Sequence, residues 1–342
     1  FRFTSRASYC SAFCFFLCNS HASRRPSQCI FGPEDLCPMT ITPSLTRSQQ
    51  TAEEILEPTP TTKLRRRIFK NHSFLIGALI LLVIIAIAVL APFIAPHDPY
   101  DQDLARRLMN PFWHDKKTDA LFALGTDKVG RDYLSRLIYG AQISLLIGFL
   151  TVLISGIIGT ALGVIAGYFG GRVDMVVNFI INTRLAMPVF LVAMAAVVAF
   201  GASIHVVIMV LGLFLWDRFA VVMRSITMQA RDLDYVTAAR AIGCSTPYII
   251  IREIFPNVLS SLTVVATVEM ANAILLEAAL SFLGFGVQAP TPSWGLMLNE
   301  GREYMFFSPW LLALPGTGLF LLVLAINLFG DGLRDVTLER ER

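Results

Sequence analysis

The sequence predicts an all-α membrane protein with six transmembrane helices. Of its 342 residues, 55% are hydrophobic and only 15% are charged, and the mean hydropathy is +0.61. These values are too apolar for an ordinary soluble domain. Apolar runs without charged residues recur from Phe74 to Phe329. The net charge of +3 gives no indication of a nucleic-acid partner.

The start of the chain differs from the rest. Five of the six cysteines lie in residues 1–38, which open with Phe1 and show no clear period. We expect this segment to be non-native or a disordered leader. A signal peptide or a zinc site fits less well, because the apolar stretch is short and the cysteines lack paired zinc-ligand spacing. Residues 39–72 are expected to be a flexible cytoplasmic lead-in to the membrane domain, residues 73–342.

Six apolar segments account for the predicted membrane helices. Insertion of the first, which carries no charge, is favourable by roughly 5 to 9 kcal/mol. Recurrent glycines in the second favour close helix contacts, because small residues let helices approach each other in lipid. The apolar region 185–216 is too short for two spans, so each must extend beyond it. The spans are predicted near residues 74–96, 144–168, 174–200, 204–225, 258–283 and 309–329.

The charges beside these spans predict the topology. Five cations in residues 63–70 place the N-terminus in the cytoplasm by the positive-inside rule. Residues 217–256 carry five arginines and are expected inside, whereas residues 284–308 are expected outside. Six spans then return the C-terminus to the cytoplasm. Three charges are expected near the cytoplasmic ends of the third and fourth spans: Arg184, Asp217 and Arg218.

The sequence contains no catalytic or cofactor motif. It has no phosphate-binding GxxxxGK[ST] loop, no GxSxG or HExxH motif and no paired metal-ligand spacing. We therefore expect neither an enzyme active site nor a metal or cofactor in this chain.

The loop 232–256 is the most informative cytoplasmic segment. Asp232 or Asp234 can cap a short helix, alanines continue it, and Gly243 suits the left-handed residue that closes it. This helix would be about 13 Å long, with an alanine-rich face that another protein could approach closely. The alternative is a surface hairpin that merely connects two spans.

A second short helix is predicted in the same loop. Thr246 can cap it, with Pro247 at its first position, and Pro256 is expected to end it before the fifth span. The loop is therefore expected to form two short helices joined by a tight turn.

This loop resembles the cytoplasmic coupling loop of ATP-binding-cassette import permeases. The family pattern is Glu-Ala-Ala, three residues, Gly, nine residues, Ile, one residue, Leu-Pro. The alanines, the glycine and the proline match. Thr237 replaces the glutamate, which removes a charged contact to the ATPase in that family, Glu253 replaces the isoleucine and Phe255 replaces the leucine. The resemblance implies these ATPase-coupling residues: Asp234, Tyr235, Ala238, Ala239, Gly243 and Pro256.

Residues 124–145, 276–295 and 327–335 resemble the second permease subunit of dipeptide and oligopeptide importers. The likeness covers about residues 70–342. It implies a type I importer permease fold with both termini in the cytoplasm, in the inner membrane of a bacterial cell. It also implies a second, different permease subunit, two ATP-binding subunits, a periplasmic solute-binding protein and a peptide substrate. ATP would bind only to the partner subunits.

Two carboxylates lie in the predicted fifth span. Glu269 is near mid-depth, and Glu277 is nearer the outside and roughly on the same helix face. A charge at mid-bilayer costs about 3 kcal/mol, so such residues usually face the bundle interior or a wet cavity. We expect Glu277 to be structural or gating. For Glu269 two interpretations are open: it lines the peptide route and meets the peptide's amino group, or it is hydrogen-bonded within the bundle or protonated.

The predicted function is half of a peptide-import pathway driven by separate ATPases. A self-sufficient proton-coupled secondary transporter would use the two carboxylates as proton sites, but it leaves the coupling loop unexplained. A membrane scaffold without transport leaves the carboxylates unexplained. Similar permeases also carry nickel chelates, glutathione or sugars, so the sequence does not name the substrate.

Overall fold

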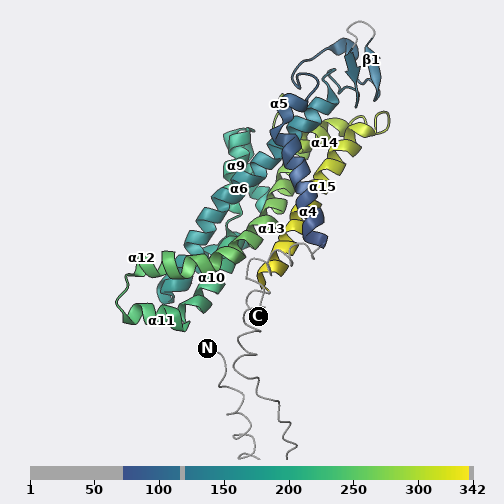
Figure 1. Cartoon of the computed structure of the whole chain (residues 1–342). Coiled ribbons are helices and arrows are strands. Elements are labelled where there is room, and N and C mark those ends of the chain that lie inside the picture. The colour runs from purple at the N-terminus through teal and green to yellow at the C-terminus, as the bar shows by residue number, and fades with distance from the viewer. Residues whose placement is uncertain (1–71, 116–119, 339–342) are drawn as a thin grey trace, which may run out of the picture. The chain divides into compact units, whose positions relative to one another are not determined.

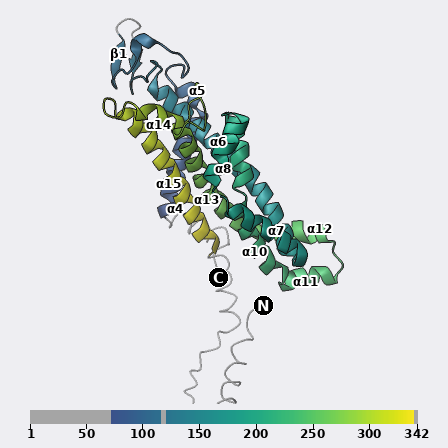
Figure 2. The same cartoon turned by 180° about the vertical axis from the view of Figure 1, so that it is seen from behind.

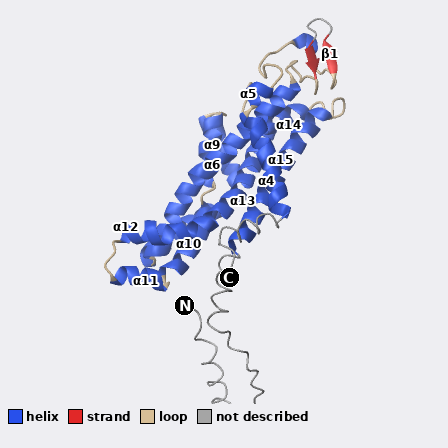
Figure 3. Ribbon diagram, viewed as in Figure 1, coloured by secondary structure: helices blue, strands red, loops and turns tan. Residues whose placement is uncertain are grey.

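The computed structural model describes residues 72–115 and 120–338. The predicted leader and the lead-in up to residue 71 lie outside these residues. Within them the chain is almost entirely helical, with one small strand pair (Figure 3). The elements up to the strand pair are α4 (His72–Val89), α5 (Ala91–Ile94), the 3₁₀ turn η1 (Leu104–Arg106), β1 (Trp113–Asp115) and β2 (Ala120–Phe122).

The remaining helices run from Tyr133 to Leu338. The first five are α6 (Tyr133–Phe169), α7 (Gly171–Leu185), α8 (Val189–Phe200), α9 (Ile204–Phe214) and α10 (Asp217–Arg231). They are followed by α11 (Asp234–Ala241), α12 (Thr246–Tyr248), the π-helical turn η2 (Ile249–Ile254), α13 (Phe255–Phe282), α14 (Trp294–Arg302) and α15 (Trp310–Leu338). In Figure 1, β1 and α14 lie at one end of the bundle, called here the β1 end, and α11 and α12 lie at the other, the α11 end.

The described helices provide five or six membrane spans. Five helical stretches are long and apolar enough to cross a bilayer, and a sixth is added if the bent pair α7 and α8 counts as one span. These five stretches are 72–89, 133–169, 204–231, 246–282 and 310–335. The predicted all-α membrane fold is confirmed, with the two-stranded antiparallel hairpin β1–β2 as an unpredicted addition.

The predicted third span, residues 174–200, is not one helix. It is divided between α7 and α8, which meet at an angle of 81°. The break falls just before Pro188, whose preceding residue is disfavoured in helical geometry. Figure 2 shows α7 beside α10 near the α11 end. Helix α8 contacts α9 and α13.

Helix α6 is the centre of the bundle and packs most extensively along α10. Three glycines of the predicted second span, Gly159, Gly163 and Gly167, face this contact, whereas Gly148 faces Ile274 on α13. A Cβ on Gly163 would lie 2.6 Å from the Ala220 carbonyl oxygen, and one on Gly167 would lie 2.7 Å from that of Arg224. The prediction that these glycines allow close helix contact is confirmed.

Replacing Gly163 with alanine should lower the free energy of unfolding by about 1–3 kcal/mol, because the added methyl group forces α6 away from the α10 backbone. Gly156→Ala is the matched control, since its Cβ would lie 3.6 Å from Phe219, an ordinary contact distance. Equilibrium unfolding in mixed micelles measures both variants. Equal effects at the two positions would contradict the assigned helix contact.

Four charged residues form an ion cluster at the β1 end: Asp127, Arg131, Arg136 and Glu300. Asp127 accepts hydrogen bonds from Arg131 at 2.6 Å and from Arg136 at 2.5 Å. Glu300, on α14, accepts from Arg136 at 2.7 Å. The Arg136 side chain is fully buried. The cluster joins the start of α6 and the loop before it to α14, so segments distant in the sequence meet at this end.

Candidate functional site

The coupling loop predicted at 232–256 forms a helical hairpin at the α11 end. Helix α11 closes with a Schellman motif: the Cys244 N–H bonds the Ala239 carbonyl, and the Gly243 N–H bonds the Arg240 carbonyl. Gly243 has φ +87°, which confirms its predicted left-handed conformation. Its lack of a Cβ makes this turn possible at little conformational cost.

The predicted helix starts in this hairpin are wrong in detail. Leu233, not Asp232 or Asp234, is the N-cap of α11, and no side chain caps it. Thr246 lies inside α12, whose N-cap is Ser245. These helices are held by packing rather than by capping side chains.

Pro256 does not end the second helix, contrary to the prediction. Helix is continuous from Thr246 to Phe282 because the π-helical turn η2 precedes the proline. A π turn widens the helix locally, which relieves the clash between a proline ring and the preceding turn. The hairpin is therefore joined to α13 by one continuous helix.

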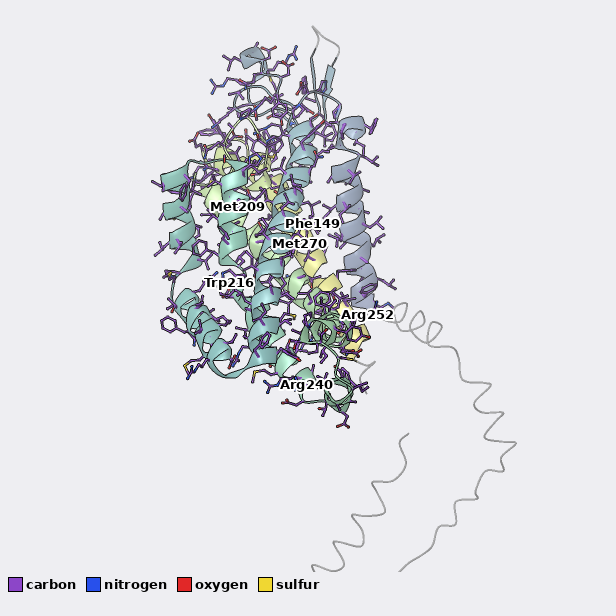
Figure 4. All side chains as sticks on the ribbon, turned by 90° about the vertical axis from the view of Figure 1, so that its left-hand side faces the viewer. Phe149, Met209, Trp216, Arg240, Arg252 and Met270 are labelled. Carbon is purple, nitrogen blue, oxygen red and sulfur yellow. The ribbon has the colours of Figure 1, made fainter. Side chains whose placement is uncertain are left out.

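One face of α11 is packed against the bundle. Val236 is completely buried, in a cluster that includes Ile249, Ile254 and Val258. Tyr235 accepts a hydrogen bond from the Asn257 side chain at 3.0 Å. Figure 4 shows Arg240 at the α11 end of the molecule, where its guanidinium lies 5.1 Å from the centre of the Tyr168 ring.

The opposite face of α11 is exposed. Asp234, Thr237 and Ala238 are exposed, and Ile242 at the tip is 82% exposed. Ala239 is buried, so only part of the predicted alanine-rich face is available to another protein. An exposed isoleucine beside small side chains is suited to fill an apolar groove of a partner.

Glu277 is fully buried in α13. Its Oε1 accepts a hydrogen bond from the Ser281 hydroxyl at 2.7 Å, and that hydroxyl accepts one from the Val287 N–H at 3.0 Å. The Ser281 carbonyl accepts a bond from Asn299 on α14 at 3.1 Å. Glu277 thus belongs to a hydrogen-bonded junction between α13, the following loop and α14.

Glu269 lies near the middle of α13, and its side chain is 2% exposed. Its Oε1 accepts hydrogen bonds from Arg218 at 3.1 Å and from Asn272 at 3.3 Å. Glu269 borders a cavity of about 390 Å³ that is not lined by Glu277. This Glu269 cavity is lined by Leu185, Asp217, Arg218, Val221, Val222, Val264, Val265, Val268 and Glu269.

The charges expected at the cytoplasmic ends of spans lie within the bundle instead. Asp217 and Arg218 begin α10 near the middle of the stretch 204–231, and Asp217 pairs with the buried Arg184 at 3.4 Å. Sequence reasoning missed both this pair and the pair between Arg218 and Glu269. The signal in the sequence was the presence of two positive and two negative charges among apolar runs. Charged residues inside an apolar bundle usually pair with one another, so ion pairs between these four could have been predicted.

A bundle of helices apolar enough to span a membrane, with an exposed helical hairpin at one end, defines a membrane protein with a surface open to a partner. Residues 159–341 match the family described as binding-protein-dependent transport system inner membrane component, and residues 59–111 match the N-terminal transmembrane domain of oligopeptide transport permease C. The chain belongs to the family of binding-protein-dependent transport system inner membrane components.

Curated relatives cover most of the chain. It is 40% identical over 266 residues to the dipeptide transport system permease protein DppC of Haemophilus influenzae, covering 78% of this chain and 90% of the relative. It is 40% identical to the di/tripeptide transport system permease protein DppC of Pseudomonas aeruginosa, with coverages of 82% and 92%. The glutathione transport system permease protein GsiD of Pectobacterium atrosepticum is 36% identical, with coverages of 81% and 90%.

A solved structure shares the fold. An inward-facing structure of the MetNI methionine ABC transporter superposes with a TM-score of 0.50 at 18% identity, covering 59% of this chain and 97% of that one. The predicted family, importer-permease fold and inner-membrane location are confirmed. The family consists of transport permeases rather than enzymes, and its members act with ATPase and substrate-binding partners.

Proposed function

We propose that this chain forms half of the pathway by which peptides cross the inner membrane, driven by ATP hydrolysis on separate subunits. Relatives named as dipeptide and di/tripeptide permeases support the substrate class. The observation that carries the driven mechanism is the exposed hairpin α11–α12, held by packing and continuous with α13. We place the α11 end and both termini in the cytoplasm.

The proposed assembly has a second, different permease subunit, two ATP-binding subunits and a periplasmic solute-binding protein. The ATP-binding subunits would contact the exposed face of α11 and its tip at Ile242. The binding protein would release peptide at the β1 end, where the ion cluster holds the loop before α6 against α14. ATP remains on the partner subunits.

The continuous helix gives the coupling a physical route. A displacement of the hairpin is transmitted through η2 into α13, which carries both intramembrane glutamates. The hydrogen bond between Tyr235 and Asn257 joins α11 to the start of α13, so the hairpin and α13 move together. Alternating access then follows from the movement of packed helices against the second permease.

The two glutamates have different proposed roles. Glu277 holds α13 to the segment before α14, and this junction transmits a displacement of α13 to the β1 end. Glu269 stands in the wall of the pathway, at the Glu269 cavity.

The secondary-transporter alternative gains no support from the relatives, which are components of binding-protein-dependent systems. A reconstitution experiment separates the two functions. Residues 39–342 are co-expressed with the neighbouring genes and purified on a tag carried by this chain, and the recovered complex is placed in proteoliposomes with loaded binding protein. We expect a second permease and ATP-binding chains to copurify, and peptide uptake to require ATP. Uptake by this chain alone, without ATP, would contradict the proposal.

A further inference from the structure

The Glu269 cavity has walls of contrasting chemistry. Five valines from α10 and α13, together with Leu185, form its apolar part. Asp217, Arg218 and Glu269 line the rest, and Arg184 pairs with Asp217. These groups are not equally accessible: the Arg218 side chain is 61% exposed, whereas Glu269, Asp217 and Arg184 are 2%, 6% and 9% exposed. Among the charged groups that line the cavity, the cation Arg218 is therefore far more exposed than the carboxylates of Asp217 and Glu269.

The position of Arg218 is fixed by its neighbours. Trp216, which Figure 4 shows between the level of Met270 and that of Arg240, is buried and precedes the first turn of α10. Asp217 is held by Arg184 at 3.4 Å. Arg218 Nη1 donates a hydrogen bond to Glu269 Oε1 at 3.1 Å. The guanidinium is thus oriented by a buried partner while most of its surface remains open.

Arg218 retains hydrogen-bonding capacity that Glu269 does not use. A guanidinium has five N–H donors in a fork that matches a carboxylate, and one hydrogen bond of Arg218 is made with the described residues. Glu269 lines the cavity but already accepts two bonds at its Oε1, and its side chain is 2% exposed. An incoming ammonium group would meet Arg218 first and be repelled, whereas a carboxylate would be attracted.

We propose that Arg218 binds the carboxylate of the transported molecule, with Glu269 as the positioning residue that holds the guanidinium when the cavity is empty. This inference rests on the proposed function, in which the open side of the cavity faces the pathway shared with a second permease. A peptide with a free C-terminus supplies such a carboxylate, and a two-pronged hydrogen bond to the fork of Arg218 would be strong at this membrane depth. It revises the expectation that Glu269 meets the peptide's amino group.

A charge exchange tests the proposal. In the double variant Arg218→Glu, Glu269→Arg the ion pair remains, but the accessible charge becomes negative. ATP-dependent uptake is measured in proteoliposomes for a dipeptide and for its C-terminal amide, each loaded on the binding protein. The uptake of each peptide by a variant is divided by its uptake by wild type. Because the binding protein is the same in both, any difference in how well it binds the two peptides cancels. We expect uptake of the free acid to fall at least tenfold and uptake of the amide to fall less than threefold.

The matched control exchanges Arg224 and Asp174, a pair joining α10 to α7 outside the cavity. The double variant Arg224→Asp, Asp174→Arg should change uptake of the two peptides by the same factor. Copurification of the partner subunits with each variant checks assembly.

Three outcomes decide the matter. If the double variant at the cavity takes up both peptides at wild-type rates, the pair is structural and the proposal is overturned. Equal losses for acid and amide in a correctly assembled complex would also overturn it. If wild-type complex moves neither peptide, the proposed function fails, and this result is distinct because it appears before any variant is compared.

Discussion

Replacing Arg136 with methionine should lower the free energy of unfolding by about 3–5 kcal/mol, a large fraction of the stability of an ordinary domain. Arg136 is fully buried and bonds both Asp127 and Glu300. Methionine preserves much of the side-chain volume but leaves the buried Asp127 and the mostly buried Glu300 to share Arg131. The loss of one partner of a buried ion cluster is costly, because the remaining charges stay desolvated without compensation.

Equilibrium unfolding of the purified chain in mixed micelles measures this effect. Arg302→Met is the matched control, since Arg302 is an exposed arginine on α14 at the same end of the molecule, 5.4 Å from the Phe282 ring. Its loss should be about 0.5–1 kcal/mol. A cost for Arg136→Met no greater than that of the control would show that the ion cluster does not hold the β1 end together.

Replacing Ile242 with aspartate should reduce ATP-dependent uptake by roughly 30-fold, the effect of losing about 2 kcal/mol at a contact hot spot. Ile242 is 82% exposed at the tip of the hairpin, so the change leaves the core intact but places a charge where an apolar partner groove is proposed. Stability in detergent should be unchanged within about 0.5 kcal/mol.

Ile242→Leu is the control, because it keeps an apolar side chain of the same size and should retain uptake within threefold. ATP hydrolysis stimulated by loaded binding protein is recorded alongside uptake. Full transport by Ile242→Asp, with partners still bound, would mean that the tip of α11 does not contribute to coupling.

The apolar runs predicted the helices well, because a helix that crosses a bilayer must be continuous and predominantly apolar over about 20 residues. The same criterion failed between α7 and α8, since hydropathy does not register a sharp bend. Pro188 was the local signal for two helices instead of one. The β1–β2 hairpin was also missed, because three-residue strands carry little periodicity.

In the candidate site, too, features set by local sequence were predicted, and features set by packing between distant segments were not. Gly243 was predicted from local chemistry alone, because a left-handed turn depends on a single residue. The capping residues were assigned wrongly because packing against Ile249 and Ile254 determines where α11 begins. Arg218 and Glu269 are 51 positions apart in the sequence. Their meeting depends on the rotation of α10 and α13 about their axes, which a single sequence does not specify.

The π-helical turn η2 has a consequence for the rotational setting of the hairpin. A π turn contains one residue more than an α turn, and each residue of an α-helix corresponds to about 100° of rotation. The azimuth at which α11 presents Ile242 is therefore offset from α13 by that extra residue. Pro256 lies in the first turn of α13, directly after η2. The rotation of the partner-facing surface about the axis of the membrane helix therefore depends on the six residues of η2, Ile249–Ile254.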